Sequence, residues 1–453
     1  MQQIQENKMG VMPINRLLIN MSMPMVVSML IMALYNVVDS VFVARISEDA
    51  LTGVSTAFPF QNLMIAVSTG TGVGLNALIS KSLGEKNREK ASDFARHGIF
   101  LAACSYLVFL ILGIFMVRPY FESQPANAAV IEYGVEYTTI VTVLSFGSFG
   151  QIAFERLMQS TGKTIYTMIT QICGAVINLI FDPILIFGFN MGVAGAAYAT
   201  VFGQIVAFVV AFLLNHFKNH ELDIDFKRFR LSGKTIGRIY AIGVPSIIMS
   251  SIGSVMYYAV NYIVMAMNST AAAVFGVYFK LQSFVFMPIF GLNNGLIPII
   301  GFNYGAQNRR RILKTFRLGI LYSVVIMLLG TLIFQTVPWL LLDFFKASDH
   351  MLSIGIPALR IISICFVFAG VDIVIGSLFQ AFGHGLASMC VSVTRQLLVL
   401  VPAAYLLSLT GNVTNVWWCF PISEIASLLV SVLYLLYLNR KIISKIPDGS
   451  DVL

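Results

Sequence analysis

The stretch GTGVGLNALISKSLGEKNR at residues 70–88 recurs in altered form as GLNNGLIPIIGFNYGAQNR at residues 291–309. The two copies align without a gap at a shift of 221 positions, so that Gly70 falls on Gly291. The same shift pairs further identical residues along the chain: Pro24 with Pro245, Gln61 with Gln282, Asn87 with Asn308, Gln159 with Gln380, and Gly162 with Gly383. The sequence is therefore an internal duplication, and such repeats in membrane transporters place the binding site between the two copies.

The composition indicates a membrane protein. The chain has 453 residues, of which 57% are hydrophobic and 11% charged, and its mean hydropathy is +0.82. Soluble domains carry about 25% charged residues, and an apolar run of roughly 20 residues spans a bilayer as a helix. Twelve such runs are predicted, at residues 17–43, 52–80, 93–117, 130–158, 165–188, 193–215, 236–266, 274–300, 313–340, 353–380, 387–409 and 414–438. We expect an all-α polytopic fold of twelve helices in two pseudo-symmetric lobes of six.

The charged loops predict the orientation in the membrane. Lysine and arginine gather at the two ends of the chain and in alternate loops, whereas the opposite loops hold only Arg45, Arg118 and Lys346. The positive-inside rule then places both termini in the cytoplasm. We expect the protein to lie in the plasma (inner) membrane. We expect no signal peptide. The net charge of +8 reflects the basic loops on the cytoplasmic side, and we do not interpret it as evidence of nucleic-acid binding. The predicted domains are an N-lobe at 1–215, a cytoplasmic linker at 216–235, a C-lobe at 236–440 and a tail at 441–453.

The first copy alone carries acidic residues inside two spans. Asp39 and Asp182 correspond to Val260 and Ala403 in the second copy. An aspartate at the centre of a transmembrane helix costs about 2.5–3.5 kcal/mol on insertion scales, so it is rare and commonly functional. Asn178 lies one turn before Asp182, and Thr200 lies at a similar depth in the next span. These four side chains could hold a proton or an alkali cation such as Na⁺, and we expect no other metal and no cofactor.

The alternative is that both aspartates only lock helices together. They are poor candidates for that role, because no basic residue lies at their depth in the same lobe. Pro24 and Pro183 interrupt the backbone hydrogen bonds of the same spans and are predicted hinges. Polar residues of both lobes are candidates for lining a substrate cavity: Tyr35, Asn36, Gln61, Asn261, Lys280 and Gln282. For Lys280, extension of the side chain towards the membrane surface is an equally good reading.

The second lobe has a different set of charges. Asp372 and Arg395 lie at similar depths on consecutive spans, which favours a structural salt bridge over a second ion site. Glu424 lies in the middle of the last span, and the sequence indicates no partner for it. In the first lobe, Glu155 and Arg156 near the end of a span are expected to form a surface pair.

Three stretches resemble the multidrug and toxic compound extrusion (MATE) family, in particular its prokaryotic members with an ion site in the first lobe. They are LYNVVDSVFVARI with the upstream Pro24, INLIFDPILIFGFNMGVAGAAYAT, and GLNNGLIPIIGFNYGAQ. The resemblance covers residues 14 to 440. It implies that Asp39, Asn178, Asp182 and Thr200 handle the coupling cation. It also implies export of cationic or amphipathic drugs in exchange for inward H⁺, which we favour, or Na⁺.

The chain departs from another branch of the family, which carries an acid in the seventh span beside the aspartate of the tenth. Here the seventh span offers Asn261 and tyrosines, while Asp372 is retained. The rival of the same class is a flippase for lipid-linked oligosaccharides, which would need a strongly basic cavity. A rival of another class is an intramembrane enzyme, but the spans lack a nucleophile–base or metal spacing of His, Cys, Ser and Asp. We expect a monomeric secondary antiporter that uses no ATP and has no enzymatic activity.

Overall fold

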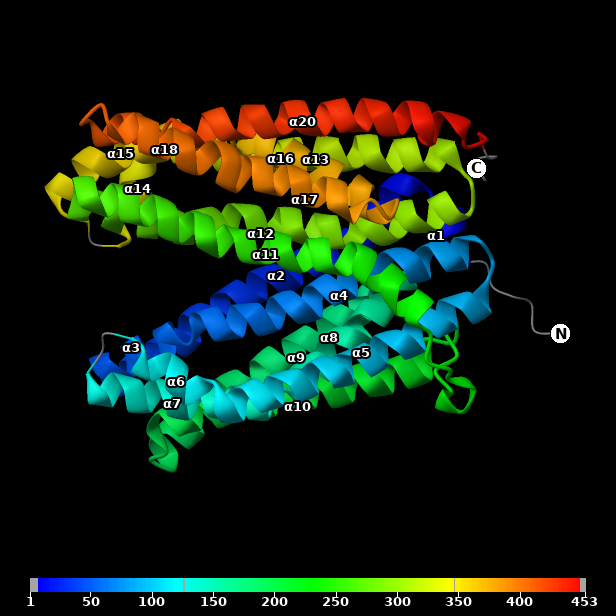
Figure 1. Ribbon diagram of the computed structural model, residues 1–453, viewed down its shortest axis with the longest axis horizontal. Coiled ribbons are helices and arrows are strands. Elements are labelled where there is room, and N and C mark those ends of the chain that lie inside the picture. Colours follow the sequence, from blue (N-terminus) through cyan, green and yellow to red (C-terminus); the bar gives the residue numbers. More distant parts are fainter. Residues whose placement is uncertain (1–6, 125–126, 346, 449–453) are drawn as a thin grey trace. The chain divides into compact units, whose positions relative to one another are not determined.

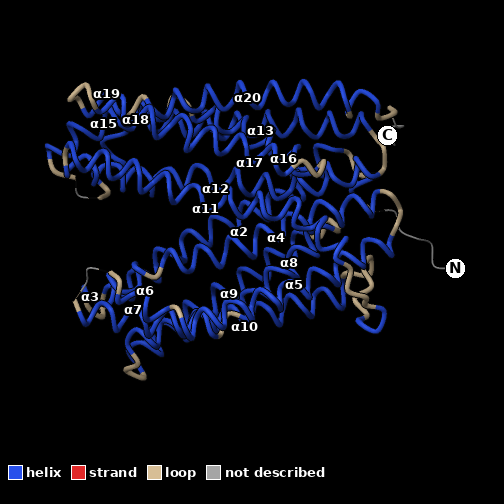
Figure 2. The backbone as a smooth tube through the Cα atoms, in the orientation of Figure 1, coloured by secondary structure: helices blue, strands red, loops and turns tan. Residues whose placement is uncertain are grey.

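A computed structural model describes residues 7–124, 127–345 and 347–448, without the side chain of Arg228. Within these residues the chain is almost entirely helical and contains no β-strand (Figures 1 and 2). Lys346, both chain ends and the last part of the predicted tail lie outside the described residues. The structure confirms the predicted all-α class.

The described chain divides into two compact units. Unit 2 runs from Val27 to Ile247, and unit 1 combines the residues up to Val26 with those from Ile248 onward. Helices that lie wholly in unit 2 are α3 (Glu48–Thr56), α4 (Phe58–Gly84), α5 (Arg88–Phe115), α6 (Val117–Glu122), α7 (Ala128–Val143), α8 (Phe146–Ser160), α9 (Thr164–Pro183), the π-helix η1 (Ile184–Gly188), α10 (Gly192–Lys218) and the 3-10 helix η2 (Phe226–Arg228). Helices that lie wholly in unit 1 are α1 (Lys8–Val11), α12 (Ser269–Gly305), α13 (Arg309–Thr336), α14 (Pro338–Asp343), α15 (Asp349–Ser363), α16 (Phe366–Ala381), α17 (Gly385–Val393), the π-helix η3 (Thr394–Leu400), α18 (Val401–Ser408), α19 (Val413–Val416), α20 (Cys419–Lys441) and η4 (Ile443–Lys445).

The number of membrane spans agrees with the prediction. Among the described residues, ten helical segments are long and apolar enough to cross a bilayer. Two helix pairs, α7 with α8 and α15 with α16, pass the same test only together and are bent by 48° and 44°. Counting each bent pair as one span gives twelve. The two bends fall at equivalent places of the duplicated sequence, so both copies fold alike at this point.

Other local features also repeat at the 221-residue shift. A left-handed backbone conformation occurs at Gly162 (φ 85°) and again at Gly383 (φ 86°). Two further pairs of positive φ angles fall at the same shift: Lys86 with Gln307, and Asn190 with Gly411. The helix N-caps repeat as well: Ser47 with Asn268, Asn87 with Asn308, and Asn127 with Ser348. Backbone turns and caps thus preserve the duplication even where the side chains have diverged.

Two long helices pass from one unit to the other. They are α2 (Ile14–Ala44), which changes unit after Val26, and α11 (Gly233–Met267), which changes unit after Ile247. In unit 1, a Cβ atom on Gly291 would lie 2.7 Å from the Cα atom of Val26. In unit 2, a Cβ atom on Gly70 would lie 2.8 Å from the backbone nitrogen of Ile247. Glycine is therefore required at equivalent contacts in the two copies, because any side chain would push the helices apart.

This division by packing differs from the predicted division by sequence, which placed the boundary in the linker at 216–235. The physical reason is that the first half of α2 packs on α12 in unit 1, where Ser22 and Val26 contact Gly295 and Gly291. The boundaries of the two sequence repeats themselves stay a prediction.

The segment between α10 and α11 is shorter than the predicted linker, and it is held against α5 within unit 2. Helix α10 extends to Lys218, and α11 begins at Gly233. Three residues of α5 hold the segment between them: the Ser92 hydroxyl accepts from the Asp223 amide at 2.9 Å, Arg96 donates to the Asp225 carbonyl at 3.4 Å, and the His97 ring accepts from the Ser232 amide at 3.0 Å.

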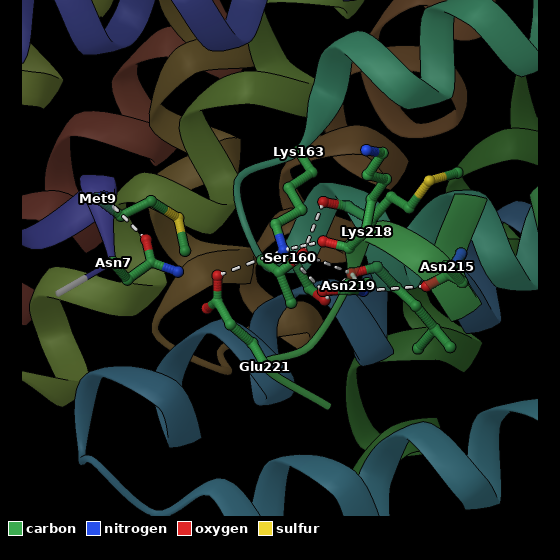
Figure 3. A network of polar contacts seen from close by, with 11 residues as sticks. Asn7, Met9, Ser160, Lys163, Asn215, Lys218, Asn219 and Glu221 are labelled. Carbon is green, nitrogen blue, oxygen red and sulfur yellow. Dashed lines mark hydrogen bonds and ion pairs between the residues drawn. The ribbon is translucent and has the colours of Figure 1, made fainter. Parts of the chain in front are cut away.

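A second group of contacts fixes the start of this segment (Figure 3). Lys163 donates to the backbone carbonyl of Lys218 and forms an ion pair with Glu221 at 3.7 Å. Asn219 donates to the side chain of Asn215 at 2.9 Å. Burial lowers the pKa of Lys163 from its usual 10.5, and the Glu221 carboxylate acts in the opposite direction. The segment is thus an anchored connection.

Candidate ion-binding site

The predicted ion site is built on the closely packed helices α9 and α10. A Cβ atom on Gly203 would come within 2.7 Å of the carbonyl oxygen of Gly174, so the two backbones touch at this point. One turn further along α9, Asn178 faces Thr200 of α10, and its amide donates to the threonine hydroxyl at 3.2 Å. Small residues at a helix crossing thereby bring polar side chains of both helices into one buried place.

Asp182 lies in this place without a positively charged partner among the described residues. Its residue is fully buried, and neither carboxylate oxygen has a hydrogen-bond partner among the described residues. Within the described part of the chain, the buried side-chain oxygen of Asn178 has no hydrogen-bond partner either. Pro183 follows directly and has no amide hydrogen to donate, and the helix continues as the π-helix η1. Buried polar atoms are normally hydrogen-bonded, so several unsatisfied oxygens in one place are a candidate site for a proton or cation that would supply the missing partner.

Asp39 of α2 faces the same place. Its carboxylate lies close enough to Asp182 for the two side chains to interact, and its Oδ1 atom is buried with no hydrogen-bond donor beside it among the residues that the structure describes. The hydroxyl of Tyr35, one turn earlier on α2, lies within range of Thr200 and of both aspartates. The structure therefore brings together all four predicted ion-site residues, Asp39, Asn178, Asp182 and Thr200, within unit 2. Their role in ion binding stays a prediction.

Sequence reasoning missed one member of this cluster. Tyr137 of α7 is 3% exposed, and its hydroxyl accepts from the side-chain amide of Gln61 on α4 at 3.2 Å. The same hydroxyl lies within range of both aspartates and of Thr200. A signal for it was present, because Tyr137 corresponds to Ala358 in the second copy and so shares the one-copy pattern of the two aspartates.

The predicted cavity residues divide between the units. Tyr35 and Gln61 belong to the cluster just described, whereas Asn36 is exposed on α2. The other three lie in unit 1, where Lys280 is exposed and Asn261 and Gln282 are half-buried. Whether these six residues line one substrate cavity stays a prediction. The hinge role of Pro24 and Pro183, which both lie inside helices, stays one too.

The predicted Asp372–Arg395 salt bridge is wrong. Arg395 instead pairs with Glu424, the acid for which the sequence indicated no partner, at 3.5 Å between Nη1 and Oε1. Asp372 accepts hydrogen bonds from two buried hydroxyls of α20, those of Ser427 and Ser431. The prediction failed because depth along a span does not say which helix a side chain faces: Arg395 faces α20, the next span, and Asp372 also faces α20, two spans further along the chain.

The predicted surface pair of Glu155 and Arg156 is wrong as well, since both residues are buried. Glu155 accepts from the amides of Gln151 and Gln171 at 2.9 and 2.8 Å, and Arg156 donates to Gln159 at 2.8 Å. Neighbours one turn away and on the next helix satisfy these charges, which the local sequence did not reveal. Within the described ranges, no group of three or more His, Cys, Asp and Glu residues is arranged to hold a metal ion.

The architecture is that of a polytopic helical membrane protein made of two repeats, with a polar cluster buried among the spans of one unit. Comparison with known proteins defines it more closely. The MatE family profile matches residues 24–184 and again residues 245–406. The chain therefore belongs to the MatE family, as the resemblance of its motifs implied.

The relatives align with this chain over about nine tenths of their length, at low identity. The multidrug export protein MepA of Staphylococcus haemolyticus is 22% identical over 408 residues, which cover 90% of both chains. A FAD transporter of Shewanella oneidensis is 24% identical over 439 residues, 91% of this chain and 92% of the relative.

Two solved structures are similar in fold over nearly the whole chain. A crystal structure of a MATE protein in complex with MaL6 has a TM-score of 0.91 at 23% identity, covering 98% of this chain and 99% of the other. An outward-facing multidrug resistance MATE family transporter of the MOP superfamily has a TM-score of 0.91 at 22% identity, with the same coverage. These likenesses confirm the fold.

Proposed function

We propose that the chain is a secondary antiporter that exports cationic or amphipathic compounds in exchange for an inward-moving cation. The exchange proceeds by alternating access, and the cation binds at Asp39, Asn178, Asp182 and Thr200. The protein lies in a plasma (inner) membrane as a monomer with both termini in the cytoplasm. It acts as a transporter without enzymatic activity and without a cofactor.

The observation that carries this proposal is the state of Asp182. An unpaired carboxylate buried in a low-dielectric interior is strongly unfavourable, and a second carboxylate nearby makes it more so. Neither Asp39 nor Asp182 forms an ion pair with a lysine or arginine among the residues that the structure describes. A proton or a bound cation would remove this cost, so occupancy of the site would respond to an ion gradient.

We favour the proton as the coupling ion, with Na⁺ as the alternative. A proton needs a single carboxylate oxygen, whereas Na⁺ needs a shell of several oxygens, which the four side chains could contribute only jointly. One elementary charge moving inward across 100 mV supplies about 2.3 kcal/mol, enough for a roughly fiftyfold concentration gradient of the exported compound.

The export of drugs is inferred from the relatives and from the distribution of charge. MepA proteins are multidrug export proteins, and they align with nearly the whole chain. The rival flippase reading needs free basic groups for a pyrophosphate. Of the three basic residues that the sequence places within spans of the second half, Arg395 is paired with Glu424, while Lys280 and Arg360 are exposed. Two exposed basic residues fall short of the strongly basic cavity that a flippase would need, so cationic cargo is favoured.

The test is efflux of a fluorescent lipophilic cation from proteoliposomes under an imposed pH gradient or an imposed Na⁺ gradient. The wild type is compared with Asp182→Asn and with Glu48→Gln, an exposed acid of α3 outside the cluster. We expect efflux to follow one gradient, to fall at least tenfold in Asp182→Asn, and to be unchanged in Glu48→Gln.

The outcomes separate the parts of the proposal. Gradient-dependent efflux that survives in Asp182→Asn would contradict the ion site. No gradient-dependent efflux from correctly folded wild type would contradict drug antiport and favour the flippase reading. Coupled efflux of FAD without efflux of the lipophilic cation would contradict drugs as the substrate but would still support antiport.

A further inference from the structure

Unit 1 contains a second cluster of buried charges, on three different helical segments. They are Asp372 on α16, Arg395 on the π-helix η3 and Glu424 on α20. Asp372 is 5% exposed, and the side chains of Arg395 and Glu424 are 20% and 13% exposed. All three segments belong to membrane-length spans, where ionisable side chains are costly and commonly functional.

Comparison of the two sequence copies shows that the fold itself does not need these charges. Arg395 and Glu424 correspond to Gly174 and Gly203, the two glycines at which α9 and α10 touch in unit 2. The same crossing thus holds an ion pair in one copy and no side chain in the other. A buried ion pair is weak evidence for stability, because well-packed apolar residues commonly serve as well. The pair therefore calls for another explanation.

The charges of the cluster do not balance. With every group ionised, two carboxylates face one guanidinium, and arginine stays protonated in proteins. Among the described residues, the groups within electrostatic range of Glu424 are Arg395 from η3, Asp372 from α16, and the Tyr278 hydroxyl and Cys365 thiol, neither of which carries a positive charge. One negative charge therefore stays uncompensated in the interior of the unit, unless a proton or a cation joins the cluster.

The hydrogen bonds indicate which carboxylate takes the proton. Asp372 accepts from Ser427 at one oxygen and from Ser431 at the other, so its ionised form is fully satisfied. Glu424 meets Arg395 with Oε1, whereas Oε2 is buried and has no hydrogen-bond partner among the described residues. We propose that Glu424 is a proton-binding site, with Oε2 as the atom that carries the proton and Arg395 and Asp372 as its ionised neighbours.

This site is distinct from the Asp39–Asp182 cluster, because its residues belong to the other unit. Proton binding at Glu424 follows from the charges of unit 1 alone. A role of that proton in export rests on the proposed antiport, in which it would add a second titrating group to each transport cycle.

The test measures the bound proton directly and needs no transport. The infrared C=O band of protonated carboxyl groups is recorded in lipid nanodiscs across a pH titration, for chains with and without Asp182→Asn. In both backgrounds we expect Glu424→Gln to remove the intensity of one carboxyl per chain, and Glu424→Asp to shift the band without removing it. Asp343→Asn, which changes an exposed acid of α14, is the control and should leave the band unchanged.

The charge count provides a second, independent test of the proton at Glu424. Arg395→Gln leaves two carboxylates without a compensating cation, so the cluster should bind two protons and its band should grow about twofold. Glu424→Gln with an unchanged band in a folded protein would overturn the proposal. So would an Arg395→Gln band of wild-type intensity, because charge balance would then not govern the site. Neither outcome depends on whether the protein exports drugs.

Discussion

Gly291 and Val26 touch backbone to backbone, since a Cβ atom on Gly291 would lie 2.7 Å from both the Cα and the nitrogen atom of Val26. Gly70 and Ile247 repeat this contact in the other unit, 221 positions away for both partners. The duplication therefore preserves a pair of close helix contacts, at the very points where α2 and α11 change unit.

The substitution Gly291→Ala should destabilise the protein by about 1–3 kcal/mol, because the added methyl group meets backbone atoms that cannot rotate away. The measurement is the midpoint of thermal unfolding in detergent. Gly237→Ala is the matched control, since a Cβ atom there on α11 has nothing within 4 Å. Equal midpoints for the two variants would show that the helices can separate without cost.

Removal of the Tyr137 hydroxyl should weaken the response to the coupling ion. Tyr137→Phe leaves the Gln61 amide without its acceptor and takes a polar group from beside both aspartates. A loss of about 1–1.5 kcal/mol corresponds to a roughly tenfold higher ion concentration for half-maximal efflux. Tyr106→Phe, at a tyrosine that contacts Phe146 outside the cluster, should leave this concentration unchanged. An identical dependence in both variants would exclude Tyr137 from the ion site.

Arg311 should contribute strongly to the stability of unit 1. It is 2% exposed and donates to the carbonyls of Met9 and Met12 at 3.0 and 2.7 Å and to the side chain of Asn303 at 3.0 Å. Arg311→Lys keeps the charge but cannot reproduce the planar set of donors, so we expect a loss of about 2 kcal/mol.

The control for this prediction is Arg317→Lys, at an exposed position of the same helix α13, which should change stability by less than about 0.5 kcal/mol. Both variants are compared by thermal unfolding in detergent. A similar small effect in the two would mean that the N-terminal helix α1 is held by other contacts.

The Lys163 contact predicts a dependence of stability on pH. Because burial lowers the pKa of Lys163 below its unfolded value of 10.5, the unfolded chain binds more protons between the two values. Stability from this group therefore rises as the pH rises from the lowered pKa towards 10.5. The Lys163→Met variant should lack this rise, whereas Lys227→Met, at an exposed position, should keep it. Parallel unfolding curves of wild type and Lys163→Met across this pH window would contradict the prediction.

The architecture was largely predictable from the sequence, because membrane-length apolar runs and an ungapped repeat are strong local signals. The two aspartates of the predicted ion site stand out in the sequence because acids inside spans are rare and because their counterparts in the second copy, Val260 and Ala403, are apolar. Tyr137 carried the same one-copy signal, but a tyrosine inside a span is common enough to pass unnoticed.

The pairing of charges was not predictable, since it depends on which helix faces which. Depth along a span can be counted from the sequence, and it placed Asp372 and Arg395 at one level. The rotation of α20 decided the outcome: it presents Glu424 to Arg395 and presents Ser427 and Ser431 to Asp372. In the same way, the buried Glu155 carboxylate is satisfied by a hydrogen bond from Gln171 on α9, a residue sixteen positions away.

The passage of α2 and α11 between the units says something about how such a chain could arise. A cut in the segment 219–232 would divide the sequence into its two copies but would leave each unit incomplete, because each copy holds the opening half-helix of the other's unit. The topology is that of a domain-swapped dimer whose two subunits have been joined end to end. A single-copy ancestor would have exchanged this half-helix with its twin. Duplication and fusion would make that exchange permanent within one polypeptide and leave the two copies free to acquire different charges.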